Sequence, residues 1–341
     1  MKSICWFRND LRVLDNPALH HCCKNSDEVI AVYFINRVQW QEHDDALIKI
    51  NFWLRNLELL KNKLEKLNIP LVVLEANNYY ETASVLKDFC VENEVKNLYF
   101  NNEYPINELE RDRNIYSSFR EDGIGVFTYH DQVIHEPGSL KTTTGNNFSV
   151  YSPFKRKWFS ELLEDQLVIL EEPEKQENMC MQSTDLSKYL DEFAHPKSEL
   201  WPAGEEFIQN YIDEFLKFKG TTYKVKRNFP AIDATAKLSP YINTGIVSSK
   251  WCLLKAREYN NGQLDDGNKG IVHWVSEILW REFYRHIIYN FPKVSKSLPF
   301  VDYTKNIPWN VNDEWLERWK EGKTGIPIVD AGIREMLETG W

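Results

Sequence analysis

The sequence has few cysteines, and they form no pattern that binds a metal. Among its six cysteines there is no C-x-x-C pair and no partner histidine at zinc spacing, so we expect a reduced chain without a metal site. Long apolar runs are also missing. Residues 1–7 are too short for a signal peptide, and no stretch approaches the roughly 18 apolar residues of a membrane span. These absences predict a cytoplasmic protein that does not enter a membrane.

The glycine-rich strings of common nucleotide-binding folds are absent as well. There is no G-x-G-x-x-G, no P-loop and no nucleotidyl-transfer histidine motif, which argues against a dehydrogenase and against a nucleotide-binding transferase. Net positive charge is also lacking. A formal charge of −10 argues against a protein that coats nucleic acid by bulk attraction, although a local basic patch can still bind DNA.

Aromatic side chains, in contrast, are abundant. A length of 341 residues predicts two domains, or one domain with a long extension. The composition, 43% hydrophobic and 27% charged, is typical of a folded protein. The 12 tryptophans exceed ordinary usage, so indole rings serve either in packing or in stacking and electron transfer.

Short apolar runs alternate with helical patterns up to residue 130. Between residues 47 and 67, leucine and isoleucine recur every three to four positions, which predicts a long amphipathic helix. Alternating strands and helices imply a parallel sheet with right-handed crossovers. Residues 1–130 are therefore predicted to form a doubly wound α/β domain. Its expected strands cover residues 3–7, 29–35, 71–74, 97–100 and 125–129.

The pattern changes twice after this domain. Residues 131–200 have weak periodicity and are interpreted as an interdomain linker with one helix at 153–163, capped by Ser152. From residue 201 onward the strand patterns disappear, so residues 201–341 are predicted to form an all-α domain. Its expected helices cover residues 207–218, 239–258, 271–291 and 313–319.

A charged loop, residues 6–19, follows the first predicted strand. Ligands of open α/β sheets bind at the carboxyl ends of strands, which makes this loop a candidate site. A structural salt-bridge network of Asp10, Arg12 and Asp15 explains the same residues equally simply.

Residues 223–245 combine a basic cluster with a predicted helix start. Ser239 and Pro240 are typical of an N-cap and first turn, where free N–H groups attract phosphate; a plain helix cap is the alternative. The basic residues Lys224, Lys226 and Arg227 form either a solvated face or a contact with DNA phosphates.

Residues 273–286 carry the most specific pattern. Glu277 lies three residues before Trp280 and four before Arg281, so we expect the three side chains to project together from one helix face. A carboxylate, an indole and a guanidinium suit a pocket for flipped bases. An ordinary Glu–Arg helix pair beside core tryptophans is the alternative.

Residues 6–19, 223–245, 273–286 and 324–341 together resemble the DNA photolyase and cryptochrome family, in particular its bacterial class I cyclobutane pyrimidine dimer photolyases. The resemblance implies FAD as cofactor, UV-damaged DNA as partner, and light-driven repair by electron transfer from reduced FAD. The implied flavin contacts are Tyr223, Thr235, Ala236, Lys237, Leu238, Ser239, Trp274, Glu277 and Arg281. The implied catalytic residues are Glu277 and Trp280, and the implied DNA contacts are Arg227, Trp280 and Arg281.

The resemblance also implies an antenna and an electron-transfer residue. The antenna would be 5,10-methenyltetrahydrofolate, held by His43, Asn107, Glu108 and Lys296; taken alone, Asn107 and Glu108 are typical of a helix start. Trp309 matches the outer electron-transfer tryptophan, with simple packing as the alternative. The family has Ser and Arg where this chain has Ala236 and Lys237, so one hydroxyl and one bidentate donor are missing.

Residues 324–341 match only the first part of a family signature, so we expect a C-terminally truncated chain with an incomplete helical domain. A cryptochrome-type photoreceptor without repair activity is the main alternative, and a nucleotide-binding transferase is a third. Glu277, Trp280 and residues 284–286 favour repair. We expect a monomer.

Overall fold

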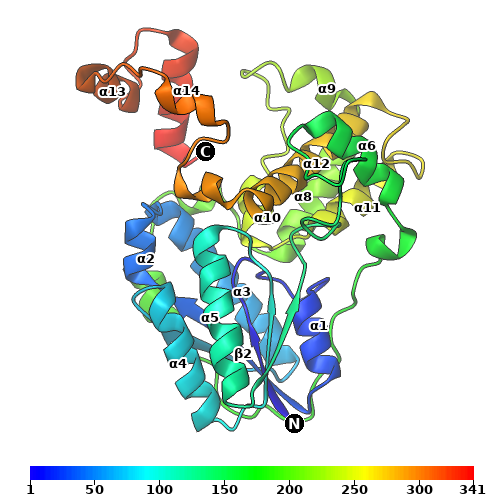
Figure 1. Cartoon of the computed structure of the whole chain (residues 1–341), viewed down its shortest axis with the longest axis vertical. Coiled ribbons are helices and arrows are strands. Elements are labelled where there is room, and N and C mark those ends of the chain that lie inside the picture. Colours follow the sequence, from blue (N-terminus) through cyan, green and yellow to red (C-terminus); the bar gives the residue numbers. More distant parts are fainter.

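The computed structural model describes residues 1–341 as a sheet body joined to a helical body (Figure 1). Five strands form one parallel sheet in the order β3-β2-β1-β4-β5. All five predicted strands are present, because their β-branched and aromatic side chains are largely buried between two layers of helices. The strands are β1 (Lys2–Trp6), β2 (Glu28–Ile35), β3 (Leu71–Glu75), β4 (Asn97–Asn101) and β5 (Gly125–Tyr129).

Helices cover both faces of the sheet and bury a separate core on each. One core joins strand residues to Leu19 and Leu54, and the other joins them to Leu86 and Ile115. The doubly wound α/β domain is therefore confirmed. Its helices are α1 (Pro17–Lys24), α2 (Arg37–Glu42), α3 (Leu47–Lys66), α4 (Tyr79–Glu92) and α5 (Ile106–Glu121).

Only helices follow residue 200, as predicted. Helices α9 and α11 pack against α12, the longest helix, whose buried apolar residues belong to a third core of 28 side chains. No helix of the structure is long and apolar enough to span a membrane. The main helices of this body are α8 (Glu205–Phe218), α9 (Tyr223–Lys226), α10 (Ser239–Thr244), α11 (Ser249–Tyr259), α12 (Lys269–Asn290), α13 (Asp313–Lys320) and α14 (Pro327–Thr339).

The single helix predicted over residues 239–258 is wrong, because the chain breaks into α10 and α11 at Gly245. Gly245 has a φ of +71°, and a Cβ atom there would lie 2.2 Å from the carbonyl O of Asn9. Only glycine permits both this left-handed backbone and the close approach to the loop after β1. The break therefore fixes the helical body against the sheet body.

Residues 131–200 are packed against both bodies. Within them, α6 (Tyr151–Glu161) contributes Phe154 and Trp158 to the helical core, and α7 (Ser187–Glu192) contributes Tyr189 to a sheet core. The predicted helix is present, but it begins at Tyr151 and no side chain caps it, so the cap expected at Ser152 is wrong. The chain also protects an edge of the sheet, since Thr184 N donates to Leu71 O at 2.8 Å.

The charged loop after β1 contacts both bodies, and the salt-bridge network considered for it is confirmed for Arg12 and Asp15, whereas Asp10 accepts hydrogen bonds from Arg8 N and Asn101 Nδ2 without an ion pair. Arg12 pairs with Asp131 and its Nη1 donates to Gly245 O at 3.0 Å. Asp15 lies 2.7 Å from Lys250 Nζ, and its carboxylate accepts from Ser248 Oγ at 2.6 Å. These partners of Arg12 and Asp15 lie outside residues 1–130, so the two charges stabilise the interface between the bodies.

Candidate functional site

Helix α12 presents Glu277 to the short helix α9. Asn268 caps α12, since its side chain accepts from the N–H of Gly270 at 2.8 Å. Two turns further on, the Glu277 carboxylate forms an ion pair with Arg227, directly after α9, and lies 3.5 Å from Nε2 of His273. The side chains of Glu277 and Arg227 remain about one third exposed. They therefore form a polar patch that a macromolecule can reach.

Trp280 lies beside this patch in a stack of aromatic rings. Its indole is stacked on Tyr151 of α6, with ring centroids 3.6 Å apart and planes inclined by 12°. Tyr284 is more than half exposed. Its ring centroid lies 5.6 Å from that of Trp280, and the two ring planes are inclined by 26°. The sequence analysis missed Tyr151, because no spacing rule relates it to a helix that begins more than a hundred residues later.

Arg281 points away from Glu277 and Trp280. Its Nη1 donates to Gln132 O at 2.7 Å, its Nη2 contacts Ile242 O at 3.5 Å, and its Nε is buried without a partner. Burial, together with Arg285, lowers the pKa of Arg281 to about 10, and no carboxylate lies within ion-pair distance. The expectation that all three side chains project together is therefore wrong for Arg281, and its cofactor or DNA contact stays a prediction.

The loop that precedes α10 offers free backbone donors. None of the N–H groups of residues 235–239 donates a hydrogen bond within the chain. Lys237 adopts a left-handed φ of +45°, and its Nζ lies 3.7 Å from Asp233. Consecutive free amides form an anion-binding concavity, so the loop fits the diphosphate of FAD. The cap expected at Ser239 is wrong: Ser239 is the first helical residue, and no side chain caps α10.

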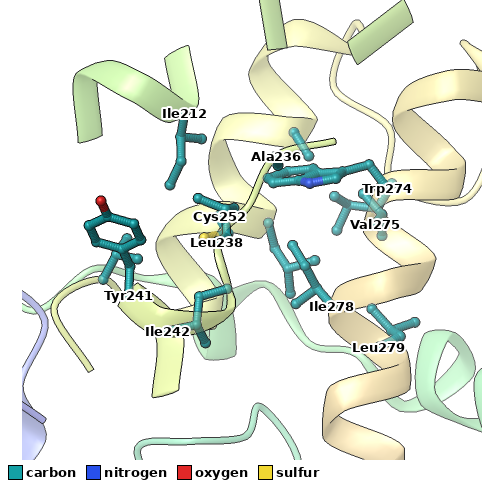
Figure 2. Close-up of a cluster of buried hydrophobic side chains, with 14 of the residues drawn as sticks. Ile212, Ala236, Leu238, Tyr241, Ile242, Cys252, Trp274, Val275, Ile278 and Leu279 are labelled. Atoms are coloured by element: carbon teal, nitrogen blue, oxygen red, sulfur yellow. The ribbon is translucent and has the colours of Figure 1, made fainter. Parts of the chain in front are cut away.

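The loop and α12 meet in one buried cluster. Figure 2 shows Ala236 and Leu238 of the loop together with Trp274 and Ile278 of α12. Tyr223, at the start of α9, is buried, with its ring centroid 6.1 Å from that of His273 and 5.4 Å from the guanidinium of Arg227. The structure therefore brings the predicted flavin residues, except Arg281, to the region between α9, α10 and α12.

Three of the predicted antenna residues, His43, Asn107 and Glu108, lie on the segments that follow strands β2 and β4. Asn107 lines a cavity of about 210 Å³ with Gln39, Tyr79 and Arg111, and His43 Nε2 lies 2.7 Å from Gln39 Nε2. Burial, and to a lesser extent the nearby carboxylate of Glu103, raises the pKa of Glu108. Arg111 and His43 partly offset this rise. Lys296 is exposed on a 3-10 helix, Pro292–Lys296, that packs against α5. Asn107 and Glu108 indeed stand in the first turn of α5, which accounts for their helix-start pattern.

Trp309, the predicted outer electron-transfer residue, is 79% exposed. Its role in electron transfer stays a prediction. A surface indole is accessible to a reductant in solution.

A doubly wound sheet body, joined to a helical body whose loop before α10 has free backbone amides, is the architecture expected of a flavoprotein. Family models agree: DNA photolyase matches residues 3–175, and the FAD binding domain of DNA photolyase matches residues 274–341. The chain belongs to the DNA photolyase family, and FAD is its cofactor.

Individual relatives and solved structures support this assignment. The deoxyribodipyrimidine photo-lyase of Buchnera aphidicola subsp. Acyrthosiphon pisum is 35% identical over 100% of this chain and 70% of its own length. Its Escherichia coli K12 counterpart is 32% identical over 99% of this chain and 71% of its own length. The crystal structure of a class III photolyase from Agrobacterium tumefaciens superposes with a TM-score of 0.86 at 27% identity, covering 100% of this chain and 69% of that one.

Proposed function

We propose that this protein repairs cyclobutane pyrimidine dimers in UV-damaged DNA in a light-dependent reaction. The observation that carries the proposal is the accessible face of α12, where the Glu277 carboxylate and the Trp280 indole stand one turn apart. A carboxylate that accepts from a base edge, beside a ring that stacks on a base, suits a dimer extruded from the duplex. A lesion that stacks poorly in DNA costs less to extrude.

FAD, when bound and reduced, supplies the single electron that light drives into the dimer. The residues of this chain hold and orient the reactants. The free amides of residues 235–239 bind the diphosphate, while Tyr223 and Trp274 line the flavin side of the site. Arg281, whose buried charge has no carboxylate partner, would be stabilised by a cofactor or DNA phosphate.

Cations around α9 are proposed to bind the DNA backbone. Lys224 and Lys226 are exposed and form no ion pair within the chain, so both ammonium groups are available to phosphates. Arg227 pairs with Glu277 and can exchange this carboxylate for a phosphate. Phosphate contacts of this kind weaken as salt rises, because counterions compete for DNA.

We also propose the antenna, the electron path and the organisation of the chain. A planar folate with its carboxylates suits the cavity near His43, Asn107 and Glu108, with Lys296 as a cation at its edge. Trp309 would pass electrons from a reductant in solution. The working unit would be a cytoplasmic monomer, with an antenna domain (1–130), a connecting segment (131–200) and a flavin- and DNA-binding domain (201–341).

The direct test is repair of an oligonucleotide that contains one thymine dimer. We expect the FAD-loaded, reduced protein to restore the undamaged strand under blue light and not in the dark, as followed by chromatography. Replacing Glu277 by Ala should weaken dimer binding by about tenfold, since a hydrogen bond to a charged group is worth about 1.5–3 kcal/mol. Glu258→Ala, at the end of α11, is the matched control. Intact flavin photochemistry without repair would contradict the proposal and indicate a cryptochrome-type photoreceptor.

A further inference from the structure

Trp280 owes its orientation to α6, a helix outside the helical domain proposed above. Tyr151 covers one face of the indole at a centroid distance of 3.6 Å with nearly parallel planes. At this distance no base fits between the two rings. A base that stacks on Trp280 must therefore use the face of the indole that Tyr151 leaves open.

Tyr151 is itself anchored to the turn that precedes Trp280. Its hydroxyl donates to the carbonyl O of Ser276 at 2.9 Å, and Ser276 is four residues before Trp280 in α12. Lys155, one turn further along α6, donates to Ser276 Oγ at 2.6 Å. Burial raises the pKa of Tyr151 to about 12, so the phenol stays protonated and keeps donating at neutral pH.

Phe283 completes the support from within α12. Its buried ring meets Trp280 edge to face at 5.7 Å and Tyr151 at 5.8 Å. Offset-stacked and edge-to-face pairs resist rotation of the rings, because each favours a narrow range of relative orientations. The indole is therefore held by rings from two helices before any substrate binds.

We propose that Tyr151 is the positioning residue of Trp280 and that discrimination of dimer-containing from undamaged DNA depends on it. A fixed indole needs no ordering when a base stacks on it, so the full stacking free energy appears as affinity. An indole free to rotate loses part of that energy. Undamaged DNA, bound through backbone phosphates, gains nothing from the stack. This proposal rests on the proposed function, because it takes Trp280 as the residue that stacks on the dimer.

The test compares Tyr151→Leu with Tyr151→Phe, which keeps the ring and loses only the hydroxyl. We expect Tyr151→Leu to raise the Kd for dimer-containing DNA by about 3- to 10-fold, with the Kd for undamaged DNA unchanged. Tyr151→Phe should stay within about twofold of the native protein. In a Trp280→Leu background, Tyr151→Leu should have no further effect, because its action passes through Trp280. Equal weakening for both DNAs, or additive losses, would overturn the proposal.

A measurement without DNA separates this proposal from the proposed function. The Trp280 signal is the fluorescence of the native protein minus that of Trp280→Phe, and the same difference is taken in each Tyr151 background. Tyr151→Leu should increase quenching of this signal by acrylamide, and Tyr151→Phe should not. Quenching can change as expected while neither the native protein nor any variant binds damaged DNA more tightly than undamaged DNA. In that case the proposed function fails and the positioning of Trp280 by Tyr151 stands. Unchanged quenching in Tyr151→Leu means that Tyr151 does not hold the indole.

Discussion

Glu282 is a fully buried carboxylate on α12 that holds the start of the connecting segment. It accepts from the N–H groups of Ile134 and His135 at 2.9 and 3.0 Å and from Trp158 Nε1 at 2.7 Å. Burial raises the pKa of Glu282 to about 6, because three donors only partly replace lost hydration. At neutral pH the Glu282 carboxylate is therefore still mostly ionised, although its buried site stabilises the protonated acid more than water does.

The raised pKa makes a pH-dependent prediction for Glu282→Gln. The folded state holds the proton more tightly than the unfolded state, so this contribution is present at low pH and is lost as pH rises through about 6. The stability of the native protein relative to Glu282→Gln should fall by about 2 kcal/mol between about pH 4 and pH 7. Urea unfolding of both proteins across this range measures the difference. A pH-independent difference would mean that Glu282 titrates normally when folded.

Single-residue pairings were the least predictable part of the site. The identities of Glu277 and Trp280 pointed to base recognition, but the partner of Glu277 is Arg227 rather than the helix neighbour Arg281. Helical spacing specifies which side chains leave α12 on one side, and it says nothing about which other element lies there. Tyr151, the closest aromatic partner of Trp280, was missed for the same reason.

At the scale of elements, the loop that we propose to bind the diphosphate offers free amides but few side-chain donors. Ala236 and Lys237 occupy positions where the family has Ser and Arg, and Ala236 is buried beside Trp274 in one cluster. A serine hydroxyl and a planar guanidinium would each add a charge-assisted hydrogen bond to a diphosphate.

We therefore expect Ala236→Ser and Lys237→Arg each to tighten FAD binding by about threefold to tenfold. Fluorescence titration with FAD measures this, and Ala231→Ser, at an exposed position of the same loop, serves as control. Unchanged affinity in both variants would show that the side chains at these positions do not face the diphosphate.

Element predictions were good where hydrophobic periodicity decides the structure. The five strands and the helices α3, α8, α12 and α13 lie close to their predicted positions. Helices α3, α8 and α12 each bury a regular apolar pattern, whereas α13 has the spacing of an amphipathic helix but no buried residue. The break between α10 and α11 was missed although Gly245 is a typical helix-end residue and Ser248 caps α11. What the local sequence does not specify is the contact between Gly245 and Asn9, two residues far apart in sequence. Local patterns cannot report such a contact.

At the scale of the whole molecule, one buried ion pair lies where the two bodies meet: Arg12 pairs with Asp131, directly after β5, and also donates to Gly245 O of the helical body. Arg12 and Asp131 are almost fully buried, and every N–H of Arg12 is directed at an acceptor in this network. Breaking a buried pair leaves an uncompensated charge, which costs more than the pair itself contributes.

Arg12→Met should therefore destabilise the protein by about 3–5 kcal/mol, and the added change Asp131→Leu should recover part of this loss. Denaturant unfolding followed by tryptophan fluorescence measures both. If the double variant is less stable than Arg12→Met, the penalty does not come from the unpaired carboxylate of Asp131.

The protected edge of β3 has a consequence for synthesis on the ribosome. All five strands are complete at residue 129, yet the backbone of Leu71 and Val73 obtains its outer partners only from Ser183 and Thr184. While the intervening residues are being translated, the nascent chain exposes an open strand edge that can pair with another chain. Slow translation across residues 130–185 would therefore favour aggregation, and a chaperone that shields strand edges would act on this interval.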